Sequence, residues 1–268
     1  MASRAHDVLA RGVKVLSLAA ILVVAPVADF PIGVSLGPPS FEPEAHVTID
    51  GVRRRIALGT PIKQLARKDD QTCSPANYTV EMRSPKELPF GRVTLGTDGD
   101  CRLTVTELYF SATPQAAPGH DLPSGLSAPG LKRALLGPLG FVAEAATHEI
   151  YGRHVYHEQF HLTVTLAHSQ FTYDDNGSSV SNPSGTSEYC WHDNLGWTTT
   201  NCYATLDNSG PTTVQKTTVG TFTNAISSLN HGLQAHARAS VGTNDATCTF
   251  SGSPPLFWHD HCEYGRFY

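Results

Sequence analysis

Apolar and polar residues alternate with a period of two in the first third of the chain. In "HVTIDGVRRRIAL", residues 46–58, two β-rich runs flank Asp50-Gly51, a dipeptide typical of a two-residue hairpin turn. In residues 91–110, alternating apolar positions again lie on both sides of a turn signal, Thr97-Asp98-Gly99-Asp100. These patterns predict a small β module over residues 46–112.

A second β-rich region covers residues 147–268. Its short runs are separated by turn signals that combine Asn, Asp, Gly, Pro and Ser: "DDNGSS", "NPSG", "DNLGW" and "DNSG". Short strands at such intervals are typical of an antiparallel sandwich or barrel. Residues 113–146 between the two regions begin rich in Pro, Gly, Ser and Ala and continue with helix formers that Gly137-Pro138 interrupts. They predict a linker with short helices.

The fold class that follows is mainly β, a disulfide-stabilised antiparallel sandwich or barrel. It has a smaller N-terminal β module and a short helical connector. The sequence leaves open whether the two β regions pack together or act as separate modules.

The N-terminus has the pattern of an export signal. Arg4, Arg11 and Lys14 precede an apolar run that ends at Ala28, and this run is shorter than the ~20 residues of a membrane-spanning helix. We therefore expect a signal peptide over residues 1–28 and a secreted protein, with an uncleaved signal that anchors the chain in a membrane as the alternative. The proline-rich residues 29–45 predict an extended lead-in.

Cysteine usage agrees with an oxidising compartment. All six cysteines follow the expected signal, and no C-x-x-C pair occurs. Fifteen pairings are open, and the simplest joins nearest neighbours, each closing a short loop worth about 3 kcal/mol. These pairs are Cys73–Cys101, Cys190–Cys202 and Cys248–Cys262.

Charge excludes one class of partner. Nineteen basic residues against 24 acidic ones give a net charge of −5, which argues against nucleic acid as a ligand. Aromatic residues gather near Cys190, where Tyr189, Trp191 and Trp197 lie, and near the C-terminus from Trp258 onward. Exposed aromatic rings on a β scaffold bind carbohydrate or protein partners, whereas a Trp beside a disulfide is also a common core filling.

The string His157-Glu158-Gln159-Phe160-His161 resembles the H-E-x-x-H motif of the zincin metallopeptidases, and the resemblance covers these five residues only. It implies a zinc hydrolase in which His157 and His161 bind the ion and Glu158 is the base. The mechanism requires a helix from about Tyr151 to Thr163. Two histidines four residues apart on a strand are about 13 Å apart and cannot share one ion.

The residues after the motif favour a strand. Val164 and Leu166 alternate with Thr165 and Ala167, and any helix is expected to end near Gly152. The favoured hypothesis therefore has no catalytic residue and no cofactor, and zinc is the alternative.

A second histidine pattern offers a different metal site. His259 and His261, two residues apart, lie on the same face of any strand, and a third ligand from a neighbouring strand would complete the site. The leading hypothesis remains a secreted β-rich protein that acts by binding an extracellular ligand or surface. A zinc hydrolase and a non-hydrolytic metal-binding protein are the alternatives.

Overall fold

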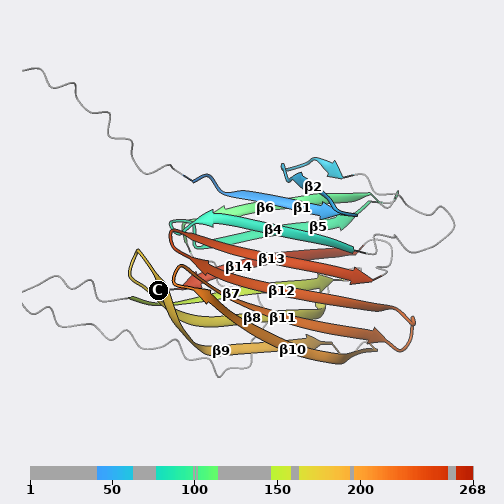
Figure 1. Cartoon of the computed structure of the whole chain (residues 1–268). Coiled ribbons are helices and arrows are strands. Elements are labelled where there is room, and N and C mark those ends of the chain that lie inside the picture. Colours follow the sequence, from blue (N-terminus) through green and yellow to red (C-terminus); the bar gives the residue numbers. More distant parts are fainter. Residues whose placement is uncertain are drawn as a thin grey trace, which may run out of the picture. The chain divides into compact units, whose positions relative to one another are not determined.

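The computed structural model describes most of the chain after residue 40. The described residues are 41–62, 77–98, 100, 102–113, 146–157, 163–193, 196–252 and 258–267. In these ranges all regular structure is β-strand, arranged as two antiparallel sheets of seven strands each. The fold is therefore a sandwich, which confirms the predicted class and decides against a barrel (Figure 1).

Sheet A has the strand order β10-β11-β12-β13-β4-β1-β2. These strands are β10 (Trp197–Gly210), β11 (Thr213–Asn224), β12 (Asn230–Ser240), β13 (Thr243–Gly252), β4 (Asn77–Pro85), β1 (Glu44–Ile49) and β2 (Val52–Arg55). Sheet B has the order β3-β6-β5-β14-β7-β8-β9. Its strands are β3 (Pro61–Ile62), β6 (Leu103–Ser111), β5 (Phe90–Thr97), β14 (His259–Phe267), β7 (Ala146–His157), β8 (Thr163–Asp175) and β9 (Val180–His192).

The two β regions of the sequence contribute strands to both sheets. In sheet A, β4 pairs with β13, and in sheet B, β5 pairs with β14 (Figure 1). Residues 41–268 accordingly form one compact unit. The lead-in expected to end at residue 45 ends earlier, because β1 begins at Glu44. The expected signal peptide and the helices between residues 114 and 145 lie outside the described residues.

Alternation along the strands separates the core from the outer faces. In β1, Ala45, Val47 and Ile49 are buried while the residues between them are partly exposed, as a period of two requires. The turn after β1 confirms the predicted hairpin, since Asp50 and Gly51 have φ of 50° and 78°. Positive φ at both central positions is the geometry that favours an Asp-Gly turn.

The centre of the core is a stack of aromatic rings contributed by both sheets. Phe250 of β13 stacks on Tyr78 and on Trp258, with ring centroids 5.2 and 5.5 Å apart. His231 of β12 packs on Tyr156 of β7 at 4.5 Å. Large rings in mutual contact supply much of the apolar surface that stabilises a sandwich.

Both disulfides among the described residues link sheet A to sheet B. Cys190 of β9 is bonded to Cys202 of β10, and Cys248 of β13 is bonded to Cys262 of β14. These are two of the three pairs predicted from the sequence. The third, Cys73–Cys101, lies outside the described residues.

A glycine lies where strands of the two sheets are in close contact. Gly152 lies inside β7, and a Cβ atom placed on it would be 2.6 Å from the backbone oxygen of His236 in β12. The expectation of a helix ending near Gly152 is therefore wrong. The glycine is there because only a hydrogen fits between the two backbones.

A polar network crosses the core between the sheets. Asp260 of β14 accepts hydrogen bonds from the Tyr78 hydroxyl and from Nε2 of His154, the latter at 2.5 Å. Nδ1 of His154 lies 3.2 Å from the backbone oxygen of Gln234. With an oxygen acceptor beside each nitrogen, the ring makes both hydrogen bonds when it is doubly protonated. His154 and Asp260 thus form a buried hydrogen-bonded pair, which is an ion pair when the imidazole is protonated.

Other histidines are buried in their neutral form, which predicts acid sensitivity. Burial, together with the positive charge of His154, lowers the pKa of His231 to about 3. Burial lowers the pKa of His168 to about 4. Between pH 6.5 and these values the unfolded chain takes up protons that the folded chain does not, so stability is lost as the pH falls. We expect a loss of about 2 kcal/mol per histidine at pH 5.

Urea unfolding at a series of pH values, with a chelator present, measures this loss. The variant His168→Gln removes one titrating group and should show a shallower decline than the wild type. Unfolding free energies that do not change between neutral pH and pH ~5 would contradict the assignment of both rings as neutral.

Candidate metal centre

Three histidines from two neighbouring strands lie together on sheet B. His259 and His261 are two residues apart on β14, and His157, the last residue of β7, is the direct cross-strand partner of His259. The three side chains can each offer one nitrogen such that all three nitrogens lie within 4.8 Å of one another. Among the described residues this is the one group of three or more potential metal ligands that meets such a limit.

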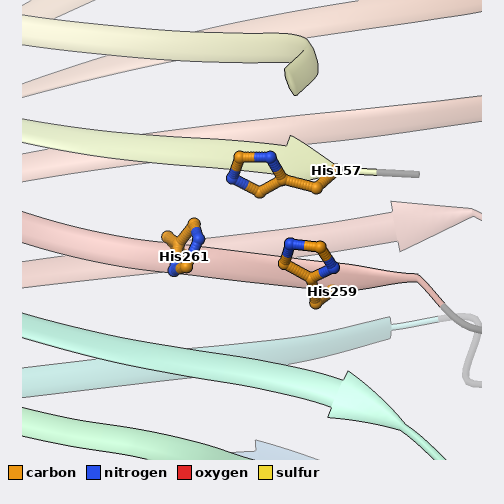
Figure 2. A group of neighbouring side chains, drawn as sticks. All are labelled: His157, His259 and His261. Carbon is orange, nitrogen blue, oxygen red and sulfur yellow. The ribbon is translucent and has the colours of Figure 1, made fainter. Parts of the chain in front are cut away.

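The cluster lies on the outer face of the sheet. Asp260 and Cys262 point into the core, so the residues that alternate with them on β14 point away from it. Figure 2 shows the rings of His157, His259 and His261 beside one another on two adjacent strands. The His157 ring lies 4.6 Å from each of the other two, parallel to His259 and perpendicular to His261.

The distances suit a shared first-row metal ion after small side-chain adjustments. A tetrahedral zinc with Zn–N bonds of about 2.0 Å holds its ligand nitrogens about 3.3 Å apart. Rotations about χ1 and χ2 of these histidines change the nitrogen positions by the ångström or so that is needed. His157 is buried and the two β14 histidines are half-buried, so the nitrogens lie near the surface of the sheet.

The neighbouring carboxylates on β14 are engaged elsewhere. Asp260 faces the opposite side of the sheet. Glu263 is on the same side as the histidines, but its two oxygens contact Nε of Arg153 at 2.5 Å and Nη2 of Arg92 at 3.3 Å. The candidate ligand set is therefore three imidazoles.

The His261 ring is also hydrogen-bonded to a residue of the neighbouring strand β5. Nδ1 of His261 lies 2.7 Å from Oγ1 of Thr94 on β5. The Thr94 hydroxyl in turn donates to Oε2 of Glu107 on β6, at 3.0 Å. A histidine ligand whose second nitrogen is held by a hydrogen bond is the usual arrangement in protein metal sites.

The structure unites parts of two separate sequence hypotheses. His157 from the H-E-x-x-H string meets the His259/His261 pair, whereas Glu158 and His161 lie outside the described residues. The helix that the zincin alternative requires from Tyr151 is wrong over its first seven residues, because Tyr151 to His157 belong to β7. Long-range strand pairing with β14 prevails there over the local helix-forming residues.

The aromatic residues singled out in the sequence divide between core and surface. Trp197 and Trp258 are buried in the core, so the core-filling interpretation holds for both. Trp191 on β9 is 41% exposed, next to the Cys190–Cys202 disulfide.

Sequence reasoning did not find the combination of His157 with the β14 pair, nor Thr94 and Glu107. The H-x-H spacing predicted that a third ligand would come from an adjacent strand. It did not identify that strand, because the register between β7 and β14 is set by pairing between segments far apart in the chain.

No family model matches the chain, and no curated protein matches it. Among solved structures, a hypothetical protein, lmo2686, from Listeria monocytogenes EGD-e is similar at 15% sequence identity and a TM-score of 0.25, over 60% of this chain and 99% of that one. No helix in the described ranges is long and apolar enough to span a membrane.

Proposed function

We propose that this protein is a secreted β-sandwich that binds a divalent first-row transition metal, zinc in the first instance, through His157, His259 and His261. The observation that carries the proposal is the convergence of three imidazole nitrogens from β7 and β14 within 4.8 Å. Histidine is the commonest metal ligand in proteins. A histidine with no role beyond the surface need not lie beside two other histidines, whereas a metal site requires such a grouping.

The chemistry of the donor set supports zinc, copper or nickel over magnesium or calcium. Imidazole nitrogens suit the first group, while the second group takes oxygen ligands. Thiolates do not compete for the ion in this region, because Cys248 and Cys262 are joined in a disulfide. Three protein ligands leave a fourth position of a tetrahedral ion to water or to a bound molecule.

Export is part of the same proposal. The disulfides are consistent with an extracellular protein, and the N-terminal pattern of basic residues followed by an apolar run supports a cleaved signal. An N-terminus at Asp29 in the secreted protein would support cleavage after Ala28.

Metal content of the mature protein, purified without a histidine tag, is the test. We expect about one zinc ion per chain in the wild type and a loss of nearly all of it in His259→Ala. The matched control is His192→Ala, since His192 lies on β9 and bonds Thr199 at 2.8 Å, outside the cluster.

The variant His161→Ala separates the proposal from the zincin alternative. A zincin site loses its metal in His161→Ala and retains it in His259→Ala, which is the reverse of what we expect. A wild-type protein that binds no zinc, copper or nickel at neutral pH would overturn the proposed function.

A further inference from the structure

We propose that Glu107 and Thr94 are positioning residues that fix the proton of His261 on Nδ1 and thereby present Nε2 to the metal. This inference rests on the metal site proposed above. It deepens that proposal by assigning a role to two residues outside the three-histidine cluster and by naming which atom of His261 binds.

The first step is the direction of the hydrogen bonds. A carboxylate has no proton to donate, so the Thr94 hydroxyl donates its one hydrogen to Oε2 of Glu107, 3.0 Å away. The same hydroxyl oxygen then has only lone pairs to offer to His261, whose Nδ1 is 2.7 Å away. Nδ1 must therefore carry the hydrogen.

The second step follows from the chemistry of imidazole. A neutral ring carries one N–H, and the other nitrogen has the lone pair that binds a metal. With the proton on Nδ1, the ligating atom of His261 is Nε2. The hydrogen bond also increases the electron density on the ring and so strengthens it as a ligand.

The third step is the sheet register, which aligns Glu107, Thr94 and His261 across three neighbouring strands. Thr94 is the direct cross-strand partner of Glu107 on β6 and of His261 on β14. Side chains at directly opposite positions are 4.5–5.5 Å apart at Cβ on one face of a sheet. The three residues thus stand side by side across three strands, and Thr94 itself is buried.

The geometry of the three-histidine cluster indicates what the Thr94 hydrogen bond does for His261. His157 and His259 face each other with parallel rings, whereas the His261 ring is perpendicular to both. A ring held by Thr94 cannot turn freely about χ2, so the third ligand is oriented before the metal arrives. Such preorganisation increases affinity, because less side-chain freedom is lost on binding.

The test compares Thr94→Val with Thr94→Ser. Valine has nearly the shape of threonine but no hydroxyl, and serine keeps the hydroxyl. We expect Thr94→Val to weaken Zn²⁺ and Co²⁺ binding by about 10- to 100-fold and Thr94→Ser to leave it close to the wild type. Thr106→Val is the matched control, because the Thr106 hydroxyl donates to the backbone oxygen of Thr94 and not to the cluster.

A second readout needs no metal. In the metal-free protein labelled with ¹⁵N-histidine, the ring nitrogen shifts of His261 should show the Nδ1–H tautomer alone. In Glu107→Ala the Thr94 hydroxyl is released to donate to Nδ1, so the Nε2–H tautomer should appear beside it. A merely structural role of Glu107 would not change this signature.

The outcomes separate the two proposals. If the wild type binds metal and Thr94→Val binds it equally well, the positioning role is overturned and the metal site stands. If the wild type binds no metal, the proposed function fails, and the tautomer of His261 still decides whether Glu107 and Thr94 set its proton. An Nε2–H tautomer in the wild type overturns the inference in either case.

Discussion

The variant Asp260→Asn is expected to lower the free energy of unfolding by about 3 kcal/mol, because it removes the buried carboxylate that is the hydrogen-bond partner of His154. Asp260 and His154 are at most 2% exposed, and the carboxylate also accepts the hydrogen bond of the Tyr78 hydroxyl. Burial and the charge of Asp260 raise the pKa of Tyr78 well above its usual value. The phenol therefore stays a donor to Asp260.

Urea unfolding in the presence of a chelator measures this effect without a contribution from bound metal. The control is Glu81→Ala, which removes the half-exposed ion pair between Glu81 and Arg53 and should cost no more than about 1 kcal/mol. If Asp260→Asn were no more destabilising than Glu81→Ala, the buried carboxylate would not stabilise the core network of His154 and Tyr78.

The variant Gly152→Ala should be destabilised by about 3 kcal/mol, at the upper end of the usual cost of overpacking. The added Cβ would meet three backbone atoms of His236 and Ala237 at 2.6 to 3.0 Å. Backbone atoms of a paired strand cannot move aside as the end of a flexible side chain can, so the two sheets would have to separate locally. Thermal unfolding of the variant measures the cost.

Gly210→Ala is the matched control for this substitution. Gly210 is also in a strand, β10, and a Cβ placed on it has nothing within 4 Å. The Gly210→Ala variant should be as stable as the wild type or slightly more stable, since alanine restricts the unfolded chain more than glycine does. Equal stability of the two alanine variants would show that the sheets tolerate a wider separation at Gly152.

Local signals in the sequence predict the architecture well. The Asp50-Gly51 turn has the positive φ angles that its residues favour, and alternation along β1 places its apolar residues in the core. The pairings Cys190–Cys202 and Cys248–Cys262 are those of nearest neighbours, the simplest of the fifteen patterns that the sequence leaves open. All these features depend on residues close together in the chain.

Features that depend on residues far apart in the chain could not be predicted from the sequence. Val164 and Ala167 both lie in the core, although an unbroken period of two would put them on opposite faces. The β7–β8 register shifts between Tyr156 and His157, which is the irregularity that changes the alternation. The same is true of the three-histidine cluster, whose members meet only through the pairing of β7 with β14.

The position of β13 and β14 in the two sheets has a consequence for how the protein acquires its fold. β13 lies between β12 and β4 in sheet A, and β14 lies between β7 and β5 in sheet B. These two strands follow all others in the sequence, so sheet A is not continuous until β13 has been synthesised, and sheet B is not continuous until β14 has been synthesised. Until then, the strands that flank β13 and β14 in the finished sheets have unpaired backbone N–H and C=O groups along one edge. Such edges can pair with other chains and lead to aggregation.

The Cys248–Cys262 bond joins these same two strands. Once formed, this bond links the last strand of sheet A to the last strand of sheet B and so ties the completion of one sheet to that of the other. The histidine pair enters with β14, so the three-histidine cluster proposed as a metal site forms only after this last strand has paired with β7.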